Sequence, residues 1–392
     1  MEESGELKSC GDSHLERFAA EIKHLIGHAQ PSIKGEVPAT CWSTNNQDVD
    51  IALSVLRAAS SSIHDGVTRF NLVFKADPGE AASESMTKEM EGFCQQMVSS
   101  LTLLVSVGAS KAMVKYCAAA VRAVLHSLKD LANALLDTSK RSQVNSLTGM
   151  VWQACKELQQ TPKTNKLACR RQMMQWSVAI KDTIEEFQET AKSAAAGNSD
   201  GKPDAVAHVV DNAERLGGPE ASGEGAGDDF DGFDDFGDMD ANYSPSELRC
   251  VEASVNILKV FRRCLKVAND ALNTLDSSQA NRREGQGDKG LEEGEWLKER
   301  LGWAHSLQSC LEDANEGAGE LGVLLYPPLS ANDLAARVDD LERSLSAFCD
   351  AFGSPEEGEG KAGSSCGLSG AVPLRAAVRD KLDALRVELE RL

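Results

Sequence analysis

Aromatic residues are scarce in this chain, at 5% of 392 residues, and long strand-like alternation is missing as well. The longest alternating stretch is the five residues from Phe70 to Phe74. Sheets favour aromatic and β-branched side chains, whereas alanine and leucine, which abound here, favour helices. The composition therefore predicts an all-α protein, and the length is sufficient for two parts that each bury a core.

Positive charge is also in short supply. The chain has 41 Lys and Arg against 61 Asp and Glu, which gives a formal net charge of −20. An acidic surface is repelled by phosphate backbones and by anionic lipid head groups, so we expect neither nucleic acid nor a membrane as a direct partner. The few basic clusters are short and lack interleaved aromatic residues, which is typical of solvated helix faces.

Cys-x-x-Cys motifs, long apolar runs and an apolar leader are all absent. The chain starts with the acidic segment 1–6, and no stretch is long enough to span a bilayer, so we expect neither a secretory signal nor a membrane anchor. We expect the protein in the cytoplasm and nucleus, where unpaired cysteines serve as small buried hydrophobes. Five of the eleven cysteines fall singly on apolar helical positions: Cys94, Cys117, Cys155, Cys264 and Cys310.

Catalytic, cofactor and metal signatures are missing too. No Gly-x-Ser-x-Gly, P-loop or dinucleotide fingerprint occurs. His24 and His28 have a metal-ligand spacing on a predicted helix, but no third ligand accompanies them. A calcium loop starting at Asp238 would place Tyr243 and Arg249 where Gly and Glu are required. We therefore expect no enzyme, no cofactor and no metal site.

Apolar residues recur at helical spacing over residues 1–195, which predicts an N-terminal helical bundle. The first helix is expected to begin at the capping box formed by Ser13 and Glu16, and Pro162 is expected to end the fifth helix. Six apolar stripes are recognisable, and they begin at Leu15, Ala52, Met86, Met113, Val144 and Leu167. The sixth stripe also includes Met173, Met174, Ile180, Ile184 and Phe187.

Residues 196–243 differ from the rest, because Gly, Asp, Glu and Ser dominate them. Such a composition buries too little apolar area to offset its ordering entropy, so we predict a disordered acidic linker. Within it, Phe230, Phe233 and Phe236 alternate with acids, in the manner of a short acidic-hydrophobic interaction motif. An inert solubilising linker is the alternative interpretation.

Helical patterning resumes at Ser244, and residues 244–392 are predicted to form a C-terminal helical bundle. Ser244 and Glu247 make a second capping box, and a proline at the first helical position supports it. Further helices are expected over 296–316, 334–352 and 374–392. In the last of these, a leucine-rich heptad pattern is barely two heptads long, which favours core packing over a zipper.

The stretch Leu248 to Glu252 reads Leu-x-Cys-x-Glu, the motif that docks on the pocket of the retinoblastoma protein. That motif binds as an extended segment. Here it follows a strong helix start, with Leu248 and Val251 on the apolar stripe. We therefore predict that it is helical, with Glu252 facing water.

Three motifs resemble a known family: Val151 to Leu158, Thr161 to Lys166, and Leu324 to Pro328. The chain is similar in them to the Grap-and-cyclin-D-interacting protein family, the cyclin-D-binding proteins. The acidic linker with its phenylalanines and glycines, followed by the Ser-Pro-Ser-Glu sequence at 244–247, resembles a plant-like branch of that family more than its animal members. The resemblance treats eight residues as a structural signature: Trp152, Cys155, Pro162, Asn165, Lys166, Tyr326, Pro327 and Pro328. From their spacing, we expect Trp152 and Cys155 to face a core, and the Tyr-Pro-Pro sequence to end a helix.

The resemblance implies a non-enzymatic regulator. Members of that family bind D-type cyclins and helix-loop-helix transcription factors, and they restrain cell-cycle progression or transcription. The family has no catalytic residues to assign. An alternative is a helical scaffold of the vinculin and catenin kind, because acidic helical bundles joined by a linker describe those adaptors equally well.

Overall fold

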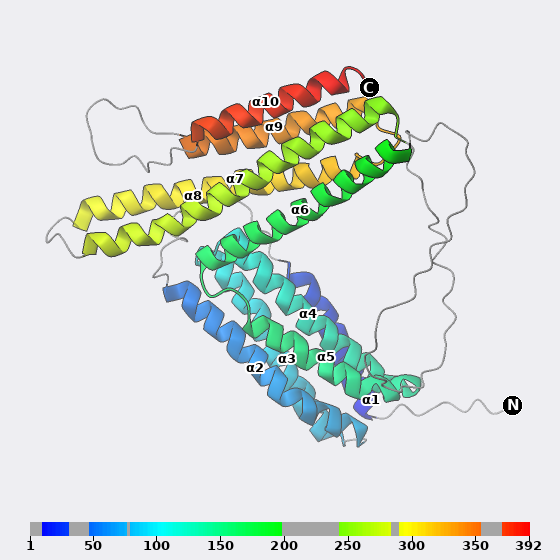
Figure 1. Cartoon of the computed structure of the whole chain (residues 1–392). Coiled ribbons are helices and arrows are strands. Elements are labelled where there is room, and N and C mark those ends of the chain that lie inside the picture. Colours follow the sequence, from blue (N-terminus) through cyan, green and yellow to red (C-terminus); the bar gives the residue numbers. More distant parts are fainter. Residues whose placement is uncertain (1–9, 31–46, 77–78, 198–242, 284–289, 354–370) are drawn as a thin grey trace, which may run out of the picture. The chain divides into compact units, whose positions relative to one another are not determined.

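The computed structural model of the chain describes residues 10–30, 47–76, 79–197, 243–283, 290–353 and 371–392. Within these ranges the chain is all-α, as predicted, and the secondary structure consists of helices and the turns between them (Figure 1). In the described part, no helix combines the length and apolarity required to cross a membrane.

The helices are long and follow the predicted stripes. Unlike the sequence-based expectation, the first helix begins at Cys10, so Ser13 lies inside it and does not start it. The element bounds are α1 Cys10–His28, α2 Gln47–Lys75, α3 Glu80–Ser106, α4 Lys111–Leu136, the 3-10 helix η2 Thr138–Gln143, α5 Val144–Gln159, α6 Asn165–Gly197, α7 Pro245–Arg283, α8 Gly290–Val323, α9 Ala331–Gly353 and α10 Ala371–Leu389.

Two compact units make up the chain. The first contains residues 1–177, 264–312 and 348–370, and the second contains 178–263, 313–347 and 371–392. Each unit draws on both sides of the predicted linker, so this division differs from the predicted parts 1–195 and 244–392. The linker falls almost wholly on residues 198–242, outside the described residues, and the predicted domain boundaries stay a prediction.

The first unit is built around a ring of five helices. Helix α1 packs against α3 and α4, α2 packs against α3 and α5, and α4 packs against α5. Each helix therefore has two main neighbours around a shared core, with additional contacts of α4 to α2 and α3, as expected of amphipathic helices with one apolar face. Phe18 of α1 and Phe70 of α2 meet there, with ring centroids 5.2 Å apart and both side chains fully buried.

In the first unit, the turn between α3 and α4 shows how local sequence determines helix ends. Gly108 has φ of 81°, a left-handed conformation that glycine adopts without steric cost and that commonly follows a helix. Ser110 then caps α4, because its side chain accepts a hydrogen bond from the amide of Met113 at 3.2 Å. This turn reverses the chain in four residues and aligns α4 with the ring.

The second unit is tied together by contacts between helices. Arg386 of α10 is paired with Asp339 of α9 at 2.7 Å and with Glu342. Arg249 of α7 is paired with Glu388 of α10 at 3.0 Å. In α10, four of the five predicted heptad residues are buried in this unit, namely Val378, Leu382, Leu385 and Leu389. The fifth, Leu392, is half-buried after the end of the helix, so core packing is confirmed for the four residues within α10.

Most predicted stripe residues are buried or half-buried, but two on the sixth stripe are exposed. Leu167 is 47% exposed and Met174 is 60% exposed, although both were expected on the apolar face of α6. Met173, next to Met174, is buried. Adjacent residues on a helix differ by about 100°, so only one of two neighbouring methionines can face the core.

Candidate partner-binding surface

The seam between α2 and α5 in the first unit is held by polar contacts along its whole length. Near one end, the Nε2 of Gln159 donates to the carbonyl of Arg57 at 2.8 Å. In the middle, the hydroxyl of Ser60 donates to the carbonyl of Cys155 at 3.3 Å. At the far end, Lys75 donates to the side chain of Asn145 at 2.7 Å. The two helices therefore run antiparallel in a fixed register.

Trp152 lies at the edge of this seam and is 40% exposed. Its indole Nε1 donates to the carbonyl of His64 at 3.2 Å, and the two rings are 6.1 Å apart. The prediction that Trp152 faces the core was wrong. The buried stripe of α5 contains Val151, Cys155 and Leu158, and Trp152 is rotated about 100° from Val151.

Cys155 is buried, as predicted, and so are three of the four other cysteines expected on apolar helical positions. Burial raises the pKa of Cys155 to about 11, with the Ser60 hydroxyl acting in the opposite direction. Burial likewise raises the pKa of the Cys117 thiol to about 11. Cys94 and Cys264 are buried and Cys310 is half-buried. The Cys155 and Cys117 thiols therefore stay protonated, and the buried cysteines pack as apolar side chains.

On α2, an exposed row of side chains leads away from Trp152. His64, Thr68 and Leu72 are spaced four residues apart, so they lie on one face of the helix, and all three are exposed. Leu72 is 62% exposed. The Nδ1 of His64 lies 3.0 Å from a carboxylate oxygen of Asp65. We call Trp152, His64, Thr68 and Leu72 the Trp152 surface.

The turn after α5 brings together three more residues of the proposed signature. Pro162 is buried between α5 and α6, and the carbonyls of Thr161 and Pro162 accept from Arg57 at 3.0 and 3.3 Å. The Oδ1 of Asn165 accepts from the amide of Ser110 at 2.8 Å. Lys166 is half-buried beside it. As predicted, α5 ends before Pro162.

Tyr326, Pro327 and Pro328 lie in the second unit, in the turn that follows α8. The helix ends at Val323, and the peptide between the two prolines is cis. Tyr326 is 53% exposed, with its hydroxyl hydrogen-bonded to Glu186 and its ring 5.2 Å from that of Phe187. The helix end was predicted correctly.

The start of α7 contacts this same turn. Glu247 accepts from the amide of Ser244 at 2.7 Å, while the Ser244 hydroxyl accepts from the amide of Glu247 at 3.2 Å. This is the predicted capping box. The other Glu247 oxygen accepts from the amide of Leu329 at 2.9 Å, and the hydroxyl of Tyr243 donates to the carbonyl of Leu325 at 2.8 Å. Burial raises the pKa of Tyr243 to about 12, with help from nearby Tyr326 and Glu247.

Several polar partners in these clusters were not identified from the sequence. Arg57, Ser110 and Glu186 each contact a signature residue more than 50 positions away, namely Pro162, Asn165 and Tyr326. Nothing in their immediate sequence distinguishes them from solvated residues on a helix face, because the contact depends on the packing of distant helices. An alignment with co-varying positions could have found them.

Three further candidate sites from the sequence are the His24 and His28 pair, the Leu248 to Glu252 stretch and the acidic segment around Asp238. His24 and His28 are exposed, and their Nε2 atoms are 3.0 Å apart. Within the described ranges, no group of three His, Cys, Asp or Glu side chains is placed to hold a metal ion. The Leu248 to Glu252 stretch is helical, with Val251 buried and Glu252 exposed as predicted, while Leu248 is half-buried. The acidic segment around Asp238 lies outside the described residues.

These features define an all-α bundle protein with an exposed aromatic side chain on its N-terminal helices. Residues 55–193 match the family model described as "Grap2 and cyclin-D-interacting, N-terminal". Residues 55–193 are therefore similar to the N-terminal part of the Grap2 and cyclin-D-interacting protein family, and two of the three motifs that predicted this resemblance lie within the match. The match includes the whole Trp152 surface and the turn at Pro162, but not the turn at Tyr326. A search of curated proteins returned no match.

Proposed function

We propose that this chain binds a D-type cyclin through the Trp152 surface and acts by binding, not by catalysis. The observation that carries the proposal is the position of Trp152, which is 40% exposed within the stretch that matches the cyclin-D-interacting family. Tryptophan is enriched among the residues that dominate the binding energy of interfaces. Its indole is already fixed by the carbonyl of His64, so little side-chain entropy is lost on binding.

The regulatory part of the proposal concerns what binding does. A protein that occupies a D-type cyclin lowers the activity of the associated kinase toward the retinoblastoma protein, which restrains the cell cycle. Binding of helix-loop-helix factors is a second part of the same proposal. The net charge of −20 supports a protein that binds these transcription factors without contacting DNA itself, because an acidic surface repels the DNA phosphates. We also propose that the protein works in the cytoplasm and nucleus, which imaging of a fluorescent fusion tests.

Calorimetry with a purified D-type cyclin tests the interaction directly. We expect Trp152→Ala to weaken binding by about tenfold to a hundredfold, the range of a central aromatic contact. Leu72→Ala should weaken it less, because it removes a smaller side chain. Val387→Ala is the matched control, since Val387 of α10 is 45% exposed but lies in the second unit. It should bind like the wild type.

Two outcomes contradict the proposal. If Trp152→Ala and Val387→Ala bind the cyclin equally well, the Trp152 surface is not the contact. If the wild type ignores cyclins but co-sediments with actin filaments, the protein is a scaffold of the vinculin and catenin kind. A kinase assay on the retinoblastoma protein, with and without the chain, separates binding from inhibition.

A further inference from the structure

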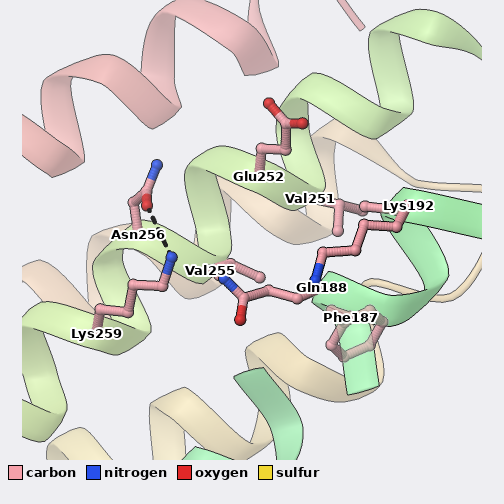
Figure 2. Close-up of a pocket in the computed structure, with 9 residues that line it drawn as sticks. Phe187, Gln188, Lys192, Val251, Glu252, Val255, Asn256 and Lys259 are labelled. Carbon is pink, nitrogen blue, oxygen red and sulfur yellow. Dashed lines mark hydrogen bonds between the residues drawn. The ribbon is translucent and has the colours of Figure 1, made fainter. Parts of the chain in front are cut away.

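A groove runs between α6 and α7 within the second unit, with a volume of about 330 Å³. Its apolar lining includes Phe187 of α6 and Val251 and Val255 of α7, with Gln188 beside them (Figure 2). The volume is at the lower end of the range for sites that hold a small ligand or a side chain. We call this site the α6–α7 groove.

Two lysines lie at opposite ends of the groove. Lys192 lies beside Val251, whereas Lys259 lies two helical turns further along α7, as Figure 2 shows. Both side chains are exposed. Glu252 also lines the groove, but its carboxylate points away from Phe187 and Val255 (Figure 2). The groove therefore combines an apolar lining with positive charge at both ends, which suits a ligand that carries apolar and acidic groups together.

The sequence of this same chain contains a segment of that chemistry. Residues 228–240 read Asp-Asp-Phe-Asp-Gly-Phe-Asp-Asp-Phe-Gly-Asp-Met-Asp, with seven aspartates and no lysine or arginine. Phe230, Phe233 and Phe236 recur every third residue among these acids. The segment lies outside the described residues, so its chemistry is taken from the sequence alone.

Chain connectivity brings this segment to the groove. It belongs to the connection between Gly197, the last residue of α6, and Pro245, the first residue of α7. Phe236 precedes Tyr243 by seven residues, and an extended chain of that length reaches about 24 Å. Val255 is ten residues along α7, or about 15 Å from its start. Phe236 can therefore reach the centre of the groove, and Phe233 and Phe230 have still more chain.

We propose that residues 228–240 bind in the α6–α7 groove of their own chain, with a phenylalanine against Val251 and Val255 and aspartates near Lys192 and Lys259. A short tether gives an effective concentration on the order of millimolar, so an intrinsic Kd near that value already fills the groove about half of the time. The segment is thus an internal ligand and not an inert spacer. This proposal is independent of cyclin binding by the first unit.

Photo-crosslinking in the full-length chain tests the proposal. We would replace Phe233 by p-benzoylphenylalanine, irradiate the purified protein, and map the cross-links in the monomer by mass spectrometry. The expected sites are residues 187–192 and 251–259. The same probe at Ala221, which has Glu220 and Glu224 nearby but no aspartate or phenylalanine within six residues, should give about fivefold fewer cross-links to these residues, because it lacks the run of aspartates.

Charge reversal supplies the matched pair of variants. Lys192→Glu/Lys259→Glu should lower the cross-link yield from position 233 by about fivefold or more, since like charges then face the aspartates. Lys23→Glu/Lys163→Glu changes the net charge equally at two exposed lysines of the first unit and should leave the yield unchanged. Circular dichroism checks that both double variants keep their helical content.

The result that overturns the proposal is equally specific. Cross-links from position 233 that spread evenly over both units exclude docking in the groove. Groove cross-links that persist undiminished in the Lys192→Glu/Lys259→Glu chain overturn the proposed pairing of aspartates with Lys192 and Lys259. Cross-links found only between chains, with a dimer on size-exclusion chromatography, exclude the intramolecular form.

Discussion

Trp152 is rotated about 100° around the axis of α5 from its neighbour Val151. This rotation determines how much of the Trp152 side chain is buried, and therefore how much it contributes to stability. Val151 is fully buried, whereas Trp152 keeps 40% of its surface exposed. Helical periodicity identified the buried stripe of α5 correctly through Cys155 and Leu158. It could not place a residue at the edge of the stripe, because the width of the buried face depends on how closely α2 approaches.

The stability of Trp152→Ala should reflect this edge position. We expect a loss of about 1–2 kcal/mol, from partial burial and one hydrogen bond to His64. Leu158→Ala, at a fully buried position of the same helix, should cost about 2–5 kcal/mol. Urea denaturation of both variants measures the difference. Equal losses would mean that Trp152 is a core residue after all.

Glu247 predicts a pH dependence of stability. Burial alone would raise its pKa, but hydrogen bonds from the amides of Leu329 and Ser244 and from the Ser244 hydroxyl hold the pKa below its ordinary value of 4.5. A lowered pKa in the folded state stabilises the fold above 4.5, and this contribution is lost as pH falls through the lower, folded-state pKa. Glu247→Gln should therefore be less stable than the wild type at pH 7, by about 1 kcal/mol.

The Glu247→Gln difference should shrink as the pH is lowered below 4.5, because the wild-type carboxylate then gains its proton. Thermal melts of both chains between pH 7 and pH 3 measure this convergence. Glu390, near the C-terminus of α10, offers a control, since Glu390→Gln removes an equal charge away from the capping box. A Glu247→Gln difference that stays constant with pH would show that the carboxylate charge does not matter.

At the scale of elements, two glycines in helices have opposite surroundings. A side chain at Gly149 of α5 would meet nothing within 4 Å, whereas one at Gly66 of α2 would lie 3.3 Å from the sulfur of Met90. Gly149→Ala should stabilise the protein by about 0.5–1 kcal/mol, because glycine costs that much in a helix interior. Gly66→Leu should destabilise it by about 1–3 kcal/mol by forcing α2 and α3 apart. Thermal melts distinguish the two signs.

The Leu-x-Cys-x-Glu sequence lies in the first turns of α7 and is therefore helical and not extended. Cys250 and Val251 are buried and the stretch is helical, so an extended docking peptide would require the first turns of α7 to unwind. That would forfeit the Ser244 cap, worth about 1 kcal/mol, and re-expose apolar side chains at about 1.5–3 kcal/mol each. We expect no retention on a retinoblastoma-type pocket domain. Strong binding that Cys250→Ala abolishes would contradict the helical interpretation.

The order and type of the helices could be predicted because each one carries its own apolar stripe and, for α7, its own capping box. Helix bounds were less accurate, as α1 shows by beginning three residues before Ser13. The candidate surface was predicted only in part. The motif around Trp152 identified the right helix, but its exposure depends on His64 and the register of α2, which are distant in sequence.

At the scale of the whole molecule, the least predictable feature is which segments of the chain come together to form the first unit. Residues of α6 in this unit contact residues more than 90 positions away. The Nε of Arg170 donates to Asn269 at 3.1 Å, the thiol of Cys169 donates to Gln308 at 3.0 Å, and the Nε2 of Gln308 donates to Gln172 at 3.0 Å. The apolar stripe of a helix indicates which of its residues are buried, but not which other helix packs against them. The sequence of α6 therefore does not reveal that these partners come from residues beyond 260.

These contacts predict that residues 1–197 do not form a self-sufficient domain. A chain truncated after Gly197 would lack Asn269 and Gln308, leaving Gln172 without a described partner in a buried position. An unsatisfied buried polar group costs about 1–3 kcal/mol, and the exposed apolar face of α6 adds to that loss. We expect the truncated chain to unfold at lower urea concentration than the full chain. Adding residues 243–392 as a separate chain should restore part of the stability, because it returns the missing partners. A truncated chain as stable as the whole protein would instead support the division at 195 that composition predicts.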